Sequence, residues 1–260
     1  MIDPRGDSLY ASAYIYQTGR RQTSNAMSDL SQAGAEALRL VAVGDPKLLD
    51  IVLLSLQVSL TAVVFACAVG LPLGAIVAVS RFPGRRTVVV VLNALMGLPP
   101  VVVGLAVYLL LSRAGPLGVM GLLFTPTAMV IAQAILITPI IAALSRQVVE
   151  DAWAEYREQL LSLGERRFGA VMTMLWDLRF SLITIVLAGF GRAAAEVGAV
   201  MIVGGNIDGV TRVMTTAIAL ETSKGDLPLA LGLGMVLLTI VLALNAGAYL
   251  VKETAQRRFG

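Results

Sequence analysis

Residues 51–80 read IVLLSLQVSLTAVVFACAVGLPLGAIVAVS, a run of 30 residues without one charged side chain. A helix of about 20 apolar residues crosses the roughly 30 Å hydrocarbon core of a bilayer, so this run is long enough to span a membrane. Three more uncharged runs of 25 to 32 residues follow, at 87–112, 114–145 and 227–251. The sequence therefore predicts a chain that crosses the membrane several times.

The composition agrees with this prediction, because 57% of the 260 residues are hydrophobic and only 14% are charged, against about 25% charged in soluble domains. A fifth apolar run, residues 180–207, is interrupted only by Arg192 and Glu196. Five spans are therefore expected, at about residues 51–80, 87–112, 122–145, 180–203 and 228–251. The runs are apolar on every face, whereas the strands of a membrane β-barrel alternate over about 10 residues, so the expected fold class is an all-α membrane protein.

The residue types exclude most catalytic chemistry. The chain has no histidine, and its single cysteine, Cys67, lies inside the first run. Histidine-dependent triads, thiolate metal clusters and disulfides within the chain are therefore excluded. No Gly-x-x-x-x-Gly-Lys-Ser/Thr loop for a nucleotide phosphate is present. We expect no catalytic residue, no metal ligand and no ATP hydrolysis by this chain, which makes an intramembrane enzyme a remote alternative.

The basic residues predict the orientation, because Lys and Arg near span ends favour the cytoplasm. With the N-terminus outside, the inner segments hold 11 basic residues and the outer segments near the spans hold 5. The inner ones are Arg81, Arg85, Arg86, Arg146, Arg157, Arg166, Arg167, Arg179, Lys252, Arg257 and Arg258, and the outer ones are Arg39, Lys47, Arg113, Arg212 and Lys224. The prediction is N-out and C-in, with the long segment 146–179 in the cytoplasm.

The two ends of the chain are expected to lie outside the spans. Residues 1–26 are polar and aperiodic, and Ser24-Asn25-Ala26 before Met27 resembles the remnant of an added tag, so an added or disordered segment is expected. Apolar residues at helical spacing predict an amphipathic lead-in over 27–47. The transmembrane domain is expected over 48–252 and a cytoplasmic tail over 253–260.

Prolines fall inside three of the expected spans. Gly70-Leu-Pro-Leu-Gly74 is expected to interrupt the first, Gly97-Leu-Pro99-Pro100 lies midway along the second, and Pro139 lies near the inner end of the third. Proline removes a backbone donor, and the freed carbonyls are tolerated at membrane depth only where protein or water satisfies them. A cavity beside Pro99 and Pro100 is therefore expected, whereas Pro72 and Pro139 are equally compatible with packing kinks.

The third span and the segment after it carry their own start and stop signals. Thr125-Pro126 is typical of a helix start, with Thr as N-cap, and the ordered core of this span is expected to end near Leu144. Segment 146–179 then predicts a helix, a break at Gly164 and a second short amphipathic helix. A ridge for a groove on a partner would consist of Leu163, Phe168, Val171 and Met172, although an ordinary solvated hairpin fits the periodicity as well.

This segment resembles a motif of a known family. Glu158-Gln-Leu-Leu-Ser-Leu-Gly164, before a basic helix, is similar to the cytoplasmic "EAA" loop of the permease subunits of type I ABC importers. Glu158 and Gly164 are in register with that motif, while Gln159 and Leu160 replace its two alanines, and 174–177 replaces its Ile-x-Leu-Pro. The resemblance implies a coupling helix that docks on an ATPase subunit, with Glu158, Leu163, Gly164 and Phe168 as the coupling residues.

A second resemblance is more specific. Residues 191–207, 211–216 and 220–226, together with 97–100 and 115–118, resemble the permeases of tungstate importers, and more loosely those for molybdate and sulfate. The resemblance covers about 48–252. It implies a five-span type I ABC importer transmembrane domain in a prokaryotic inner membrane. The implied partners are a second copy, two ATPase subunits that bind ATP and Mg, and an extracytoplasmic oxyanion-binding protein; no cofactor of its own and no nucleic acid is implied.

The charged pair inside the fourth run has two interpretations. Arg192 and Glu196 are four residues apart, hence on one face of a helix, and each ion costs roughly 2.5 to 3.5 kcal/mol at mid-membrane. They either neutralise each other and specify packing, or line the path of an oxyanion that Arg192 attracts and Glu196 repels. The translocation path or gate is expected to include Arg192, Glu196, Pro99, Pro100, Asn206, Thr215 and Thr216.

The function that the resemblance implies is that of the permease subunit of an importer for a tetrahedral oxyanion, with tungstate as the expected substrate and molybdate or sulfate as alternatives. An ion-coupled secondary transporter is the rival from another class, with Glu196 as the coupling carboxylate near the midplane. Inverted repeats are not evident in five spans, and this rival leaves the long segment 146–179 unexplained.

Overall fold

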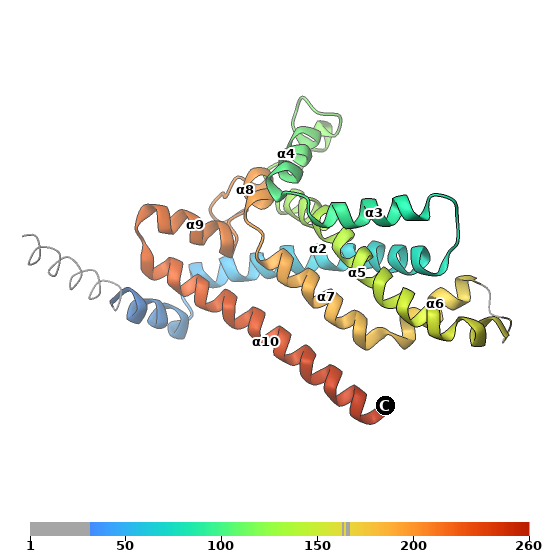
Figure 1. The fold of residues 1–260 in the computed structure, drawn as a ribbon. Helices are drawn as coiled ribbons and strands as arrows, with labels where there is room; N and C mark the ends of the chain where they lie inside the picture. The colour runs from blue at the N-terminus through green and yellow to red at the C-terminus, as the bar shows by residue number, and fades with distance from the viewer. Residues whose placement is uncertain (1–31, 163, 165–166, 260) are drawn as a thin grey trace, which may run out of the picture.

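The computed structural model describes residues 32–162, 164 and 167–259, and within these residues all regular structure is helical (Figure 1). The expected segment 1–26 and residue Leu163 lie outside the described residues. A helix over 32–43 comes first. The elements that follow are α2 (Pro46–Val79), α3 (Arg85–Met96), α4 (Pro100–Leu111), η1 (Gly118–Met120), α5 (Pro126–Ser162), α6 (Arg167–Asp177), α7 (Arg179–Ala194), α8 (Gly198–Gly204), α9 (Met214–Lys224) and α10 (Leu227–Phe259).

The helices long and apolar enough to cross a membrane agree with the predicted class. Three pass by themselves, namely α2, α5 and α10, and up to five spans result if two bent pairs each count as one. The bent pairs are α3 with α4, at 98°, and Gly169–Asp177 with α7, at 77°. Five is therefore the upper count, and the second predicted span is a broken span or a re-entrant segment.

Helices α2 and α5 form the centre of the fold and lie side by side, with α3 on one side and α7 on the other (Figure 1). The two helices approach closely at Gly74. A Cβ atom built there would lie 2.0 Å from Ser145 Oγ and 2.4 Å from the Ala142 carbonyl oxygen. The Ser145 hydroxyl also donates to the Gly70 carbonyl at 3.4 Å. Small residues spaced by four are a common device for close packing of membrane helices.

The predicted interruption of the first span at Gly70–Gly74 is wrong, because α2 continues through Pro72 to Val79. These glycines serve the contact with α5 instead of breaking the helix. Helix α5 likewise continues through Pro139. At the Gly97–Pro99 segment, by contrast, the predicted break is real: α3 ends at Met96, and Pro99 and Pro100 begin α4.

The predicted start of the third span is confirmed, and the helix continues without a break past the predicted end of the span. Helix α5 begins at Pro126, and the Thr125 hydroxyl accepts a hydrogen bond from the Ala128 N–H at 3.4 Å. The helix does not end near Leu144 but continues to Ser162, 37 residues in all, or about 55 Å. The charges after Leu144 do not stop it, since Arg146 and Glu150 pair along the helix. Helix α5 therefore extends well beyond a bilayer core.

The helix, glycine break and second helix predicted for 146–179 are confirmed. Gly164 has φ of 79°, in the left-handed region that favours glycine, and α6 follows it. The predicted ridge is wrong at Val171, which is buried with Met174 against the end of α2. Met172 is exposed.

The segment predicted as the fourth span is broken into two helices. Helix α7 ends at Ala194, and α8 begins at Gly198. Helix α8 packs tightly on α4, since a Cβ atom at Gly104 would lie 2.7 Å from Ala199 Cα. Beyond it, α9 packs on α10, whose most apolar stretch is only 17% buried, against 50% and 56% for α2 and α5. Helix α10 therefore lies at the periphery of the single chain.

Candidate functional site

The break between α7 and α8 holds the charged pair that the sequence predicted. Arg192 Nη2 lies 3.9 Å from Glu196 Oε2, and Glu196 Oε1 accepts the Ala199 N–H at 3.1 Å. The pair forms as predicted, although Glu196 lies in the non-helical break and not on the same helix as Arg192. The carboxylate side chain is 5% exposed, whereas the guanidinium side chain is 43% exposed. A buried carboxylate thus holds a cation that reaches the surface midway along an apolar run.

Two side chains from neighbouring helices hold the backbone of this break. Gln133, on α5, donates from Nε2 to the Ala193 carbonyl at 3.1 Å, and Thr215, on α9, donates its hydroxyl to the Glu196 carbonyl at 2.8 Å. Both donors are buried. Carbonyls that a helix end leaves free are therefore satisfied by protein, as membrane depth requires. Sequence reasoning missed Gln133, although a single glutamine in the uncharged run 114–145 is a usable signal.

The other residues predicted for the path are held by contacts within the chain. Thr216 is 1% exposed, and its hydroxyl bonds the backbone of Val213 as donor and as acceptor, at 3.1 Å each. Asn206 has a positive φ of 52° and donates from Nδ2 to the Thr216 carbonyl at 3.4 Å. In this structure Asn206 and Thr216 order the segment between α8 and α9, and Thr215 holds the break before α8. Contact of these three residues with passing substrate stays a prediction.

The corner at Pro99 and Pro100 lies next to the charged break. A Cβ atom at Gly198 would lie 2.9 Å from Val101 Cγ2, one residue after Pro100, and 3.8 Å from Glu196 Oε1. The structure therefore brings the α3–α4 corner and Glu196 together from segments almost 100 residues apart. The cavity predicted beside the two prolines stays a prediction.

The residues predicted to couple to an ATPase lie at the other end of α7. Glu158 is exposed on the extension of α5, and Gly164 is exposed in the turn before α6. Leu163 and the side chain of Phe168 lie outside the described residues. Helix α6 leads directly into α7, which ends at the charged break, so one helix connects the two predicted sites (Figure 1).

Several cavities among the described residues contain none of these predicted residues, and two of them are described next. A cavity of about 770 Å³ between α2 and the segment before α9 is lined by charged groups of both signs, among them Lys47, Asp50, Asp208 and Arg212. Arg212 is already paired with Asp208 at 2.7 Å. The second, of about 460 Å³, lies between the helix over 32–43 and α10.

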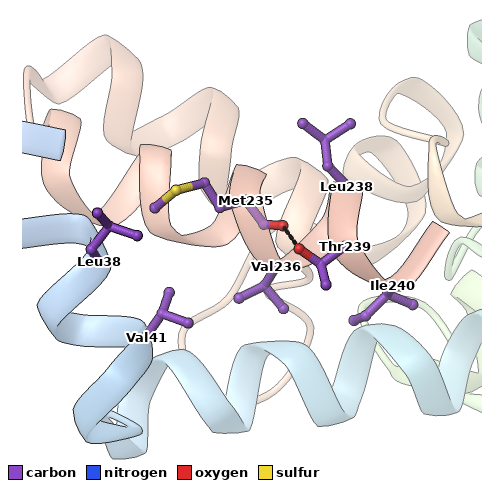
Figure 2. A pocket seen from close by; sticks show the side chains of 7 residues that line it. All are labelled: Leu38, Val41, Met235, Val236, Leu238, Thr239 and Ile240. Atoms are coloured by element: carbon purple, nitrogen blue, oxygen red, sulfur yellow. Dashed lines mark hydrogen bonds between the residues drawn. The ribbon is translucent and has the colours of Figure 1, made fainter. Parts of the chain in front are cut away.

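Figure 2 shows that apolar side chains line this second cavity, and that its one hydroxyl, on Thr239, donates to the Met235 carbonyl of its own helix at 2.8 Å. Its chemistry suits hydrocarbon and not an anion.

Together these features define a class: an all-α membrane protein with a broken helix that carries an ion pair at mid-span, and with a long helical extension at one end. No family model matches the chain. It is 43% identical over 227 residues to the tungstate uptake system permease protein of Peptoclostridium acidaminophilum, covering 87% of this chain and all of that protein. It is 40% identical over 215 residues to a probable anion ABC transporter permease protein of Haloferax volcanii, covering 80% and 93%. To the molybdenum transport system permease protein of Escherichia coli it is 30% identical over 188 residues, covering 67% and 81%.

The chain therefore belongs to the oxyanion permease family of ABC transporters, and the resemblance inferred from its motifs is confirmed. It is a multi-pass membrane protein and a transport subunit, not an enzyme. Membership implies ATPase and binding-protein partners.

Proposed function

We propose that this chain forms the transmembrane path of an importer for a tetrahedral oxyanion, with tungstate as the preferred substrate. Support comes from two relatives described as tungstate uptake permeases, at 43% and 40% identity, whereas those described as sulfate permeases are 27% to 29% identical. Molybdate and sulfate are the competing substrates, and the assay below separates the three.

The observation that carries the proposal is the exposed guanidinium of Arg192. A charged side chain at mid-membrane costs roughly 2.5 to 3.5 kcal/mol, so such groups face a bundle interior or a water-filled cavity. Arg192 is 43% exposed in the single chain, and its partner Glu196 is buried. We assign the face that carries Arg192 to the aqueous path, because exposure of this charge to lipid would be costly.

The ion pair also suits transient binding of a passing oxyanion better than tight binding. Arg192 attracts an oxyanion, while Glu196 competes for the same guanidinium at 3.9 Å. Conduction requires binding that is favourable enough to enter and weak enough to leave. A cation shared with a buried carboxylate meets both requirements.

In this proposal the chain is oriented N-out and C-in, and the transmembrane domain spans 48–252, between a lead-in over 27–47 and a tail over 253–260. The extension of α5, the turn at Gly164 and α6 then form a cytoplasmic coupling unit. ATP binding and hydrolysis, with Mg, belong to two partner subunits that grip Glu158, Leu163, Gly164 and Phe168. Because α6 leads directly into α7, a displacement of α6 would reach the charged break through a single helix.

A second copy of the chain completes the path in this proposal. Helix α4 is apolar all round and leaves Val101, Val102, Leu105, Leu109 and Leu110 exposed, and α10 is also largely exposed. Such faces need lipid or another protein. Two copies that bring their Arg192 faces together would enclose a water-filled path and keep both cations out of lipid.

The test is uptake by the complete transporter in proteoliposomes, with the binding protein loaded with tungstate, molybdate or sulfate in turn. Arg192→Gln is expected to lower tungstate uptake by about tenfold or more, since the lost attraction of one charge exceeds about 1.4 kcal/mol. The matched control is Arg113→Gln, because Arg113 is exposed outside the helices. Wild-type uptake by Arg192→Gln would refute the assigned path, and faster uptake of sulfate or molybdate than of tungstate would refute the substrate.

A further inference from the structure

A third cavity, of about 390 Å³, lies where α2 ends, and its lining includes none of the residues assigned above to the path or to the contact with the ATPase. The loop 80–84, the start of α3 and the extension of α5 form its other walls. Its lining includes the apolar side chains of Ala78, Val79 and Trp153, here called the floor, and two arginines, Arg81 and Arg157, here called the rim arginines. The cavity thus combines apolar and cationic lining groups.

The one carboxylate in its lining is already neutralised. Glu150 accepts a hydrogen bond from Arg85 Nη2 at 2.7 Å through one oxygen, and its other oxygen bonds Arg146. Arg85 Nε in turn donates to the Val77 carbonyl at 2.8 Å. Four residues from α2, α3 and α5 therefore brace the cavity, and each oxygen of Glu150 already pairs with an arginine.

The two rim arginines remain without an acidic partner. Among the residues that the structure describes, neither Arg81 nor Arg157 makes an ion pair or a side-chain hydrogen bond. The acidic residues nearest in sequence to Arg157 are Glu155 and Glu158, which are exposed and do not line the cavity. The cavity therefore presents two free guanidinium groups, which suit the planar, bidentate binding of a phosphate.

The depth of the cavity in the membrane indicates which phosphate-bearing ligand fits it. Val79 is the last residue of α2, at the end of the uncharged run 51–80, so the cavity lies at the boundary between hydrocarbon and water. Helix α3, which leads away from it, exposes Val90 and Val91, an apolar surface for acyl chains. Free phosphate or oxyanion would make no use of the apolar floor or of this surface.

We propose that this cavity binds the headgroup of an anionic phospholipid, with Arg81 and Arg157 on the phosphate and the acyl chains along α3. The inference rests on the proposed orientation, which places this end of α2 on the cytoplasmic side, where basic pockets between membrane helices bind anionic headgroups. A lipid held here would brace α2, α3 and α5 beside α6.

The test uses the complete transporter in nanodiscs that contain phosphatidylethanolamine and phosphatidylglycerol, with retained lipid read by native mass spectrometry. Each basic side chain near an anionic headgroup contributes about fivefold, so Arg81→Gln with Arg157→Gln should lower phosphatidylglycerol retention by about thirtyfold. Arg86→Gln is the matched control, since Arg86 is exposed nearby and does not line the cavity. Wild type and control are expected to retain phosphatidylglycerol in preference to phosphatidylethanolamine.

Equal retention in the double variant, or equal retention of the two lipids by wild type, would overturn the inference. So would release of phosphatidylglycerol by excess inorganic phosphate or tungstate, which would make this a site for free oxyanion. Loss of the ATPase subunits from the double variant with lipid retained would instead assign the arginines to a protein contact, and likewise overturn it. Tungstate uptake is measured in the same preparation: if wild type transports while the lipid result fails, the proposed function stands and this inference alone falls.

Discussion

Replacing Glu196 by glutamine removes one buried negative charge and keeps an oxygen that can accept the Ala199 N–H. The ion pair that is lost is long, at 3.9 Å, and Arg192 is 43% exposed. Its loss should therefore resemble that of an exposed pair, about 0 to 1 kcal/mol, more than the 3 to 5 kcal/mol of a fully buried one. The variant should fold and assemble with its partner subunits.

The effect on transport should be larger than the effect on stability. Without the Glu196 carboxylate, the oxyanion no longer competes with Glu196 for Arg192. The attraction between two unit charges about 4 Å apart is up to about 4 kcal/mol at an effective dielectric constant of 20. Even a third of this slows release about tenfold. Glu196→Gln should therefore bind oxyanion more tightly and transport it at least about tenfold more slowly.

The assay is tungstate uptake as a function of concentration, which separates apparent affinity from maximal rate, with assembly checked by copurification of the ATPase subunits. Glu221→Gln is a matched control, because Glu221 is also a buried carboxylate, 3.1 Å from a half-exposed cation, Lys224. Wild-type uptake by Glu196→Gln would remove Glu196 from the mechanism. An equal loss in both variants would show that a buried carboxylate matters only for packing.

Two further predictions concern the frame around the break. Gly74→Val should lower the stability of the purified complex by about 1 to 3 kcal/mol, since its Cβ would lie 2.0 Å from a hydroxyl oxygen on α5. Thermal unfolding in detergent measures this against Gly234→Val, where a Cβ meets nothing within 4 Å, and equal melting of the two would refute the close contact. Gln133→Leu should leave the Ala193 carbonyl unsatisfied, destabilise by about 1 to 3 kcal/mol and slow uptake. Gln147→Leu, at an exposed position of the same helix, is its control, and identical uptake by both would show that Gln133 does not hold the break.

Much of the fold was predictable because charge and length determine where a chain can cross a membrane. The uncharged runs located α2, α5 and α10, and Thr125-Pro126 located the start of α5, because these signals are local. The end of α5 was not predictable from charge, since Arg146 and Glu150 pair along the helix and let it continue. Neither was the role of Gly70, whose meaning depends on a helix about 70 residues later.

The candidate site was predictable only in part for the same reason. Two charges in an apolar run are conspicuous, and their pairing follows from their spacing. The break between α7 and α8 is not predictable from the sequence, because it depends on Gln133 and Thr215, which come from α5 and α9. Hydroxyls such as that of Thr216 signal polarity in sequence, but only the structure shows that they are occupied within the chain.

In the proposed mechanism an external ATPase drives this path through the turn at Gly164. Gly164 has φ of 79°, so aspartate there is strained while the spans are untouched. The decisive measurement is ATP-dependent tungstate uptake by the reconstituted transporter with wild-type chain or Gly164→Asp. We expect ATP-driven uptake by wild type, and loss of both uptake and the bound ATPase subunits in the variant. Uptake by this chain alone, driven by an ion gradient and unaffected by Gly164→Asp, would contradict it.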